Sequence, residues 1–458
     1  MTAPLAGASP EAVSARSVAA RVVQRVFEDQ AFVSEALDHE LGSSRLAARD
    51  RALATELSYG VVRLEPALTE RLAALARRGV AKGDELLRSH LLVAAYQLLV
   101  LDRVPAFAAI NEAVNKVRHH RGPKVAGFAN AVLRRLAASG ARLPLAAALE
   151  ASIEPWLFTA LCDAVGREAA LGLLGIPGAP VAGAEAAGVQ SAGAPSAGVR
   201  RGLCVRLTSR ASPPPAWAAT AEPGALAPGA LWLPPSGDLR HLEGYAEGAF
   251  VVQEEGAQWA ALALGAQPGE RILDACAGHG QKSSLLAERI GSEGRLWVSD
   301  ISESKLARLR REFERLGLQA PQCRAVDLSL GVGDLPGDMD RVLVDAPCTG
   351  TGTLRRRPEI SRRLTPDDPR RLADQATLLL THAATRARPG GRVLFVVCSV
   401  LRVECEDVAE RVRGVLEPFP FDAPEAQRIA GPEQWQCRLL PSVHGTDGYY
   451  LASFRRRA

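Results

Sequence analysis

Two cysteines of this chain stand where short apolar runs end. Cys348 comes four residues after the run 342–344, and Cys398 directly follows the run 393–397. Apolar runs of this length are typical of strands that are buried on both faces of a parallel sheet. The carboxyl ends of such strands share one edge of the sheet, where open α/β sheets bind their ligands. We therefore expect two thiols at one sheet edge, a pair that suggests chemistry.

Acidic residues end the expected strands in the same half of the chain. A dinucleotide site would want Gly-x-Gly-x-x-Gly after its first strand, but the turn 276–280 holds only Gly278 and Gly280. Any one acid alone is well explained as a helix cap or a turn residue. Four acids aligned in this way favour a nucleoside that carries a cationic sulfonium and an amino group. These acids are Asp274, Asp300, Asp327 and Asp345.

Strands and helices alternate from residue 250 onward, which predicts a parallel, doubly wound sheet. A final antiparallel pair is expected over 435–440 and 448–454. The expected strands are 271–275, 295–300, 323–326, one that ends at Asp345, and 392–397, and the expected helices are 282–290, one that ends at Gly317, and 367–388.

The first part of the chain has a helical pattern throughout. Apolar residues such as Val18, Val22 and Val26 recur every four residues between 17 and 136. The stretch 86–101 is so apolar that we expect it to be the central helix of a bundle. A basic loop is expected over 117–124, where a solvated surface and contact with RNA phosphates are equally good interpretations.

Composition limits the classes of protein to which the chain could belong. The chain has 458 residues, a net charge of +4 and many more arginines than lysines, which allows nucleic acid as a partner without requiring it. Its eight cysteines lack paired Cys-x-x-Cys spacing, so we expect reduced thiols in a cytoplasmic protein and no metal site. No run approaches the ~20 apolar residues of a membrane span. The predicted domains are 1–142, helical; 143–246, a connecting region with a Gly/Ala-rich insertion at 175–198; and 247–458, α/β.

Two sets of motifs resemble known families. The helical region, with 110–114 and 127–133, resembles the all-helical RNA-binding fold of the transcription antitermination factor NusB. The stretch 345–352, which reads Asp-Ala-Pro-Cys-Thr-Gly-Thr-Gly, and the Cys-Ser-Val that begins at Cys398 resemble the RNA 5-methylcytosine methyltransferases of the Sun (NSUN) family. The resemblance implies an all-α NusB-like bundle followed by an α/β Rossmann-like domain that takes a methyl group from S-adenosyl-L-methionine.

The resemblance also implies roles for particular residues. Cys398 is the expected nucleophile toward carbon 6 of cytosine, Cys348 assists proton removal and release, and Asp345 contacts the target base and the methyl donor. Asp300 is expected at the ribose, and Asp327 at the adenine amino group. The remaining expected cofactor-binding residues form the loop after the first strand: Cys276, Ala277, Gly278, His279, Gly280 and Lys282.

The implied partner is small-subunit (16S) ribosomal RNA, bound by a protein that we expect to be a monomer. An arginine-rich segment beside Cys348 is the expected phosphate track, with the target base flipped out of any helix. The family usually has Ala-Pro-Gly-Gly where this chain has Gly-His-Gly-Gln at 278–281. A non-catalytic RNA-binding or ribosome-assembly factor is therefore the alternative, and a nicotinamide-dependent oxidoreductase is third. The arginines of the expected track are Arg355, Arg356, Arg357, Arg362 and Arg363.

Overall fold

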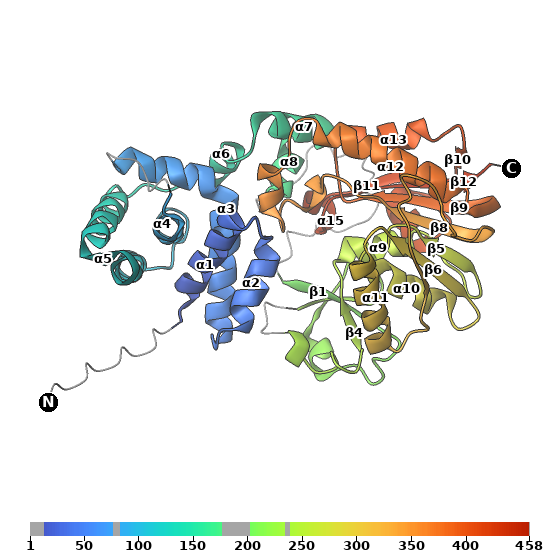
Figure 1. The fold of residues 1–458 in the computed structure, drawn as a ribbon, viewed down its shortest axis with the longest axis horizontal. Helices are drawn as coiled ribbons and strands as arrows, with labels where there is room; N and C mark the ends of the chain where they lie inside the picture. Colours follow the sequence, from blue (N-terminus) through green and yellow to red (C-terminus); the bar gives the residue numbers. More distant parts are fainter. Residues whose placement is uncertain (1–12, 77–82, 176–201, 234–238, 458) are drawn as a thin grey trace. The chain divides into compact units, whose positions relative to one another are not determined.

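The computed structural model describes residues 13–76, 83–175, 202–233 and 239–457. The chain divides into two compact units (Figure 1). The first holds Met1–Ile153 together with Arg356–Glu359, and the second holds Glu154–Arg355 and Ile360–Ala458. The Gly/Ala-rich insertion expected at 175–198 lies, apart from its first residue, outside the described residues. No helix in the described ranges has the length and apolarity needed to cross a membrane.

The first unit is the helical bundle that the apolar periodicity predicts. Helix α4 packs against α1, α3 and α5 and is buried along most of its length, which confirms the expectation for 86–101. A helix that is apolar on all sides is stable only when other elements surround it. The helices are α1 (Ala15–Glu28), α2 (Val33–Gly42), α3 (Ala48–Leu75), α4 (Glu85–Leu99), α5 (Ala106–Ala138) and α6 (Leu145–Glu150).

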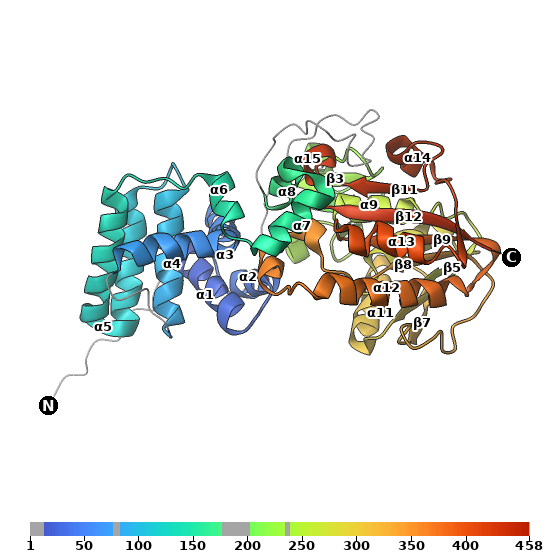
Figure 2. The ribbon, with the colours of Figure 1, turned by 90° about the horizontal axis from the view of Figure 1, so that it is seen from above.

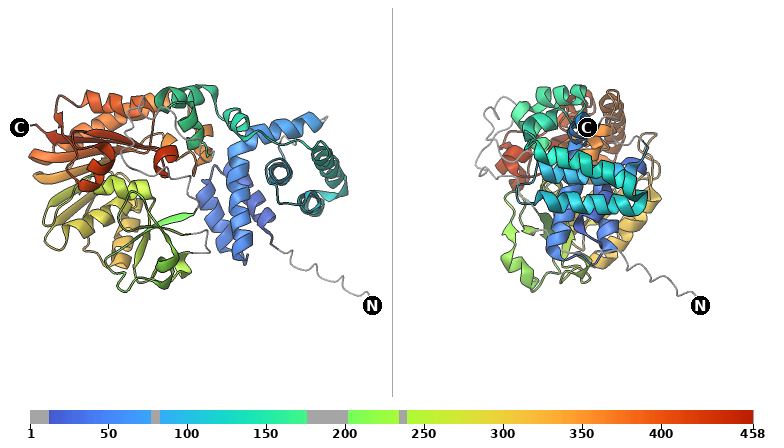
Figure 3. Two further views of the ribbon diagram at one scale, coloured as in Figure 1. Left: turned by 180° about the vertical axis from the view of Figure 1, so that it is seen from behind. Right: turned by 90° about the vertical axis from the view of Figure 1, so that its left-hand side faces the viewer.

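Helix α5 corrects the expectation of a basic loop over 117–124. The segment is helical except at Gly122, which has φ 81° and ψ 174°. Glycine adopts this conformation without a Cβ penalty, and Pro123 then begins the next helical stretch with its preset φ. The two halves of α5 therefore turn back and lie side by side (Figures 2 and 3). The basic side chains are exposed at this turn, where Arg121 pairs with Asp84.

The second unit begins with two short helices, α7 (Pro155–Val165) and α8 (Arg167–Leu173). A small antiparallel sheet follows them. Its strand order is β2-β3-β1-β4. Trp232 is buried and donates its indole N–H to Glu255, and half-buried Trp217 packs edge-on against Phe250, so both tryptophans belong to the packing of this subdomain. The strands are β1 (Leu203–Leu207), β2 (Glu222–Pro223), β3 (Ala230–Leu233) and β4 (Phe250–Val252).

The second unit is built around an eight-stranded sheet in the order β10-β12-β9-β8-β5-β6-β7, with β11 paired to β12. Strands β7, β6, β5, β8 and β9 are parallel, and β12 runs antiparallel to β9. The predicted α/β class and the final antiparallel pair are confirmed. The strands are β5 (Arg271–Asp274), β6 (Arg295–Asp300), β7 (Gln322–Ala325), β8 (Met339–Asp345), β9 (Ala387–Val397), β10 (Leu416–Pro418), β11 (Gln436–Leu439) and β12 (Tyr449–Arg456).

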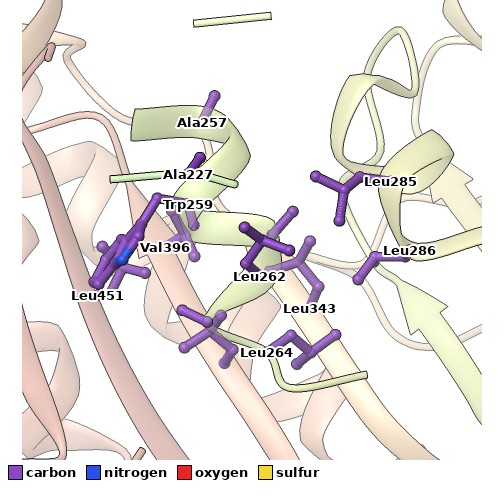
Figure 4. Packing of buried hydrophobic residues seen from close by; sticks show 14 of the residues in the cluster. Ala227, Ala257, Trp259, Leu262, Leu264, Leu285, Leu286, Leu343, Val396 and Leu451 are labelled. Carbon is purple, nitrogen blue, oxygen red and sulfur yellow. The ribbon is translucent and has the colours of Figure 1, made fainter. Parts of the chain in front are cut away.

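Helices cover both faces of this sheet because successive strand residues point to opposite sides. One apolar cluster joins α9, α10 and α11 to one face, and Figure 4 shows Trp259 of α9 beside Val396 and Leu451 in it. A second cluster joins α12 and α13 to the other face. Full burial of one Leu or Val side chain stabilises the fold by about 1.5–3 kcal/mol. The helices are α9 (Glu255–Leu262), α10 (Gln281–Ile290), α11 (Glu303–Leu316), α12 (Asp368–Ala384), α13 (Glu406–Arg411), α14 (Pro424–Ala430) and α15 (Pro441–His444).

Candidate active site

The two cysteines singled out in the sequence meet at the carboxyl edge of the sheet. Strands β8 and β9 are adjacent and parallel, with Asp345 opposite Val396, so the segments that leave them run together. The Sγ atoms of Cys348 and Cys398 lie 3.5 Å apart, and both side chains are partly exposed. Parallel pairing thus turns a sequence separation of fifty residues into direct contact between two thiols.

This contact couples the protonation of the two thiols. The pKa of Cys348 is raised well above its usual value, first because its S–H is hydrogen-bonded to Cys398, then because of burial and the nearby negative charge of Glu404. A thiol that donates to its neighbour favours the neighbour's ionised form. Either sulfur can be the donor in this contact, and the raised pKa of Cys348 is the observation that points to Cys348 as the partner that keeps its proton.

A close backbone stack holds the edge in place beside the sulfurs. Gly352 N donates to Cys398 O at 2.9 Å, and Gly352 O accepts from Gly448 N at 2.8 Å. A Cβ on Gly352 would overlap the carbonyl of Gly448. Only glycine allows three backbones to approach this closely. The loop after β8 is therefore fixed both to the end of β9 and to the loop before β12.

Lys282 and Asp345 form an ion pair next to the cysteines. Lys282 Nζ lies 2.6 Å from Asp345 Oδ2 and 5.9 Å from the centre of the Tyr449 ring. Burial alone would lower the pKa of Lys282, but the charge and hydrogen bond of Asp345 outweigh burial, and the pKa is raised. The lysine therefore stays a cation and holds the carboxylate at the end of β8.

The loop 276–280 between β5 and α10 forms a cradle of backbone groups. Gly278 and Gly280 have φ of 55° and 82°. Gly278 N donates to Asp300 Oδ2 at 3.1 Å, while the Ala277 amide donates to Ser299 O at 2.9 Å. A Cβ on Gly280 would strike Leu309 of α11, whereas a Cβ on Gly278 would meet open space. The loop is thus packed against α11 at Gly280 and open at Gly278, and His279 is exposed.

Asp274 at the end of β5 is a buried acid with unused hydrogen-bonding capacity. It is 1% exposed, and its Oδ2 accepts from Ser283 Oγ at 2.6 Å. Within the described ranges, Oδ1 accepts no hydrogen bond of ordinary geometry. Burial raises the pKa of Asp274 to about 6. The backbone of Cys276 also approaches this carboxyl group, so Ser283 and the start of the loop together hold Asp274 at the end of β5.

Asp300 lies at the end of β6 and Asp327 follows β7, as predicted, but both acids hydrogen-bond to residues that are close in the chain. Asp300 Oδ1 accepts from Ser302 N at 2.9 Å, and Asp327 Oδ1 accepts from the amide and hydroxyl of Ser329 at 2.9 and 2.6 Å. Both acids therefore act as turn-forming residues. Asp300 also accepts from the glycine loop, through the amide of Gly278.

The arginines of the expected phosphate track differ in exposure. Arg356, Arg357 and Arg362 are exposed and Arg363 is half-buried, whereas Arg355 is 9% exposed and pairs with Asp447. Residues 356–359 are counted with the helical unit. There the Arg357 guanidinium lies 5.9 Å from the Phe32 ring centre, and Val33 N donates to Glu359 at 3.2 Å.

Three side chains of the site carry no sequence signal that would single them out. Ser283 holds Asp274, Tyr449 faces Lys282, and Glu404 binds the loops of both cysteines. Each comes from a position that only tertiary packing brings to the site. Cys405 and Cys437 are buried, as expected for packing thiols, and half-buried Cys276 has a pKa raised by burial. Across the described residues, no three His, Cys, Asp or Glu side chains cluster as metal ligands would.

Comparisons with known proteins agree with this architecture. A family model described as 16S rRNA methyltransferase RsmB/F matches residues 261–455, and a model described as NusB family matches residues 13–138. Ribosomal RNA small subunit methyltransferase B of Pseudomonas syringae is 30% identical over 95% of this chain and 96% of its own length. The protein of the same name from Vibrio cholerae is 30% identical over 96% of this chain and 97% of its own length. The crystal structure of PH0851 shares the fold, with a TM-score of 0.72 and 20% identity over 97% of this chain and all of that chain.

Proposed function

We propose, because this chain belongs to the RsmB/F family of S-adenosylmethionine-dependent 16S rRNA methyltransferases, that it methylates carbon 5 of a cytosine in small-subunit ribosomal RNA. The reaction would pass through a covalent cysteine–cytosine intermediate. The observation that carries this proposal is the 3.5 Å contact of Cys348 and Cys398 beside the Lys282–Asp345 pair. One thiol can add to the cytosine while the other takes up or releases a proton, and the carboxyl group of Asp345 is available to contact the cytosine ring.

The covalent step overcomes the low reactivity of carbon 5. Carbon 5 of cytosine is a weak nucleophile because its electron density is tied into the aromatic ring. When the Cys398 thiolate adds to carbon 6, the conjugation is broken and carbon 5 becomes enamine-like. S-adenosylmethionine, when bound, supplies an electrophilic methyl group on a cationic sulfur. The hydrogen bond from Cys348 supports this role for Cys398, since it favours the thiolate at that position.

Release of the product requires removal of the proton from carbon 5. As that C–H bond breaks, its electron pair forms the carbon 5–carbon 6 double bond, and the sulfur of Cys398 departs as a thiolate. Cys348 is proposed to assist this elimination, since its sulfur touches that of Cys398. Asp345 is proposed to transfer a proton to ring nitrogen 3 as negative charge develops there, and the Lys282 ammonium, which donates to Asp345, would stabilise the carboxylate that results.

The cofactor is proposed to lie along the edge formed by β5, β6 and β7. The open space at Gly278 supports a bound group there. Asp300 is proposed at the ribose and Asp327 at the adenine amino group. The loop residues proposed to line the methionine end are Cys276, Ala277, Gly278, His279, Gly280 and Lys282.

Ribosomal RNA is the proposed partner of both ends of the chain. Exposed arginines such as Arg356, Arg357 and Arg362 can bind phosphates, and the target base would be flipped out toward Cys398. Arg363 is half-buried and the guanidinium of Arg355 is largely covered, so the exposed arginines are the better supported contacts. The helical domain, proposed as residues 1–142, would add RNA contacts outside the catalytic domain, proposed as residues 247–458.

Two measurements test the proposal. Isothermal titration of the full chain with S-adenosylmethionine should show saturable binding, and its absence would instead favour a non-catalytic RNA-binding or ribosome-assembly factor. Bisulfite sequencing of ribosomal RNA from a strain that lacks the gene should then reveal one cytosine that has lost its methyl group. Unchanged methylation at every cytosine would contradict the assignment to carbon 5 of cytosine.

A further inference from the structure

Glu404 is a buried carboxylate that binds the loops of both cysteines. It ends the short helix η6 (Arg402–Glu404), six residues after Cys398, and is 1% exposed. Its Oε1 accepts from Thr349 N at 2.7 Å, and its Oε2 accepts from Ser399 Oγ at 2.6 Å and from Thr349 Oγ1. Thr349 directly follows Cys348, and Ser399 directly follows Cys398. One side chain is therefore hydrogen-bonded to the residue after each thiol.

The hydrogen bonds around Glu404 continue into a connected network. Ser399 Oγ lies 3.0 Å from Thr351 Oγ1 and accepts from Leu401 N at 3.2 Å. Thr351 Oγ1 accepts from Val400 N at 3.2 Å. Ser399 Oγ accepts from Leu401 N and donates its own proton to Glu404, and the Thr349 hydroxyl donates to the same carboxylate. A carboxyl group that meets three donors is suited to its ionised, acceptor-only form.

We propose that Glu404 is a positioning residue that holds the Cys348 loop and the Cys398 loop in register, so that the two sulfurs stay in contact. This inference rests on the function proposed above and adds a residue that does not touch substrate. Glu404 also acts electrostatically, because its charge contributes to the raised pKa of Cys348. Burial raises the pKa of Glu404 itself, while Ser399 and Thr349 oppose that rise by hydrogen bonding.

The test separates the geometry of Glu404 from its charge. Glu404→Gln keeps the shape but removes the charge and turns one acceptor into a donor that faces donors. Glu404→Asp keeps the charge but withdraws the carboxylate by about 1.5 Å, the length of one C–C bond. Asp407→Asn is the matched control, since Asp407 is a half-exposed carboxylate on α13 that pairs with Arg402 at 3.1 Å.

The first readout does not depend on methyl transfer. Alkylation of Cys348 by iodoacetamide is followed against pH by peptide mass spectrometry on the full chain. The midpoint should move to lower pH in Glu404→Gln, and it should stay at the wild-type value in Asp407→Asn and close to it in Glu404→Asp. The same midpoint in Glu404→Gln and Asp407→Asn would overturn the electrostatic role, even if the wild-type protein proved to have no methyltransferase activity.

The second readout is methyl transfer to ribosomal RNA. Both Glu404 variants should lose about 10²-fold in kcat with little change in KM for RNA, the size of effect that a misplacement of about 1 Å produces. Wild-type kcat in Glu404→Asp would overturn the positioning role. If Glu404→Gln does not fold, Thr349→Val removes one hydroxyl donor and should lower kcat in the same direction by a smaller factor. An unchanged kcat in that variant would also overturn the proposal.

Discussion

Lys282 Nζ donates to Asp345 Oδ2 at 2.6 Å, and this ion pair joins the first turn of α10 to the end of β8. The loop before α10 is the proposed cofactor cradle, and the segment after β8 carries Cys348. A single contact thus connects the proposed binding of the methyl donor to the proposed binding of the base. The pair is mostly buried on the lysine side, which is 13% exposed, so it is poorly screened by solvent.

Removing the lysine charge should impair catalysis. Lys282→Met keeps the aliphatic stem but leaves Asp345 without its cation, so the carboxylate is no longer held toward the base. We expect kcat for methyl transfer to fall by about 10²–10³-fold, as when a positioned electrostatic contact is lost. Arg413→Met, which removes an exposed cation paired with Glu410, should leave kcat unchanged. Equal kcat values for the two variants would contradict a catalytic role for the pair.

Loss of the nucleophile should abolish methylation but not RNA binding. Cys398→Ala removes the atom proposed to add to carbon 6, whereas the exposed arginines proposed to bind phosphate are untouched. A tritium-transfer assay should give only background, while filter binding should give the wild-type Kd for ribosomal RNA. Residual methyl transfer above one-thousandth of wild type would argue that another thiol attacks.

Loss of Cys348 should trap the covalent intermediate. Without the thiol proposed to assist elimination, addition and methyl transfer should still proceed, so a protein–RNA adduct should accumulate in Cys348→Ala. The adduct would appear as a slowly migrating band on a denaturing gel in the presence of S-adenosylmethionine. The double variant Cys348→Ala, Cys398→Ala should show no such band, and an adduct that forms without Cys398 would reverse the two roles.

Asp274 should make stability depend on pH. Its native pKa of about 6 lies above the unfolded value of 3.8, so between these limits the native state holds a proton that the unfolded state has lost. The stabilisation is therefore fully present below about pH 4 and is lost as pH rises through about 6, by about 3 kcal/mol in total. Urea unfolding gives the free energy of unfolding of wild type and of Asp274→Asn at each pH between about 4 and 7. The value for wild type minus the value for the variant should fall as pH rises. Parallel curves would show that Asp274 is not titrating in this window.

Two neighbouring arginines should have different effects. Arg357→Ala removes an exposed charge, so the slope of log K for RNA against log salt should fall in magnitude by about 1. Arg355→Ala instead breaks a buried pair with Asp447 and should lower the free energy of unfolding by about 3–5 kcal/mol. Denaturant titration and salt-dependent binding measured on both variants would separate the roles. A pure RNA-binding defect in Arg355→Ala would contradict the structural role.

Local patterns predicted the fold well where apolar runs are bounded by turn residues. Strand β6 has the expected ends, β5 and β8 end within a residue of expectation, and Gly317 caps α11 with φ 62°. Strand β9 begins earlier than expected because Ala387 pairs with Met339 before a register shift, an irregularity that the Pro-Gly-Gly segment hides in the sequence. The loop expected over 117–124 is reduced to a turn at Gly122, because the residues on both sides of it are helical.

The site was predictable where chemistry and strand ends coincide. Cys348, Cys398 and Asp345 lie beside strand ends, so parallel pairing alone brings them together. Glu404 and Tyr449 were not predictable, because each reaches the site through packing of a segment with no distinctive motif. In the sequence, Glu404 cannot be distinguished from a surface acid, because only the fold brings together the two loops that it binds.

The contact between Gly352 and Gly448 has a consequence for the order of assembly during synthesis. The loop that carries Cys348 is made about a hundred residues before Gly448, and β12, which follows Gly448, pairs with β9. A nascent chain that has already formed β5, β6, β8 and β9 therefore still lacks the backbone partner that supports the loop after Cys348. We expect the two thiols to reach their final geometry only when β12 joins the sheet. The thiols should therefore become reactive late in biogenesis, after the edge of β5 and β6 that is proposed to bind the cofactor has formed.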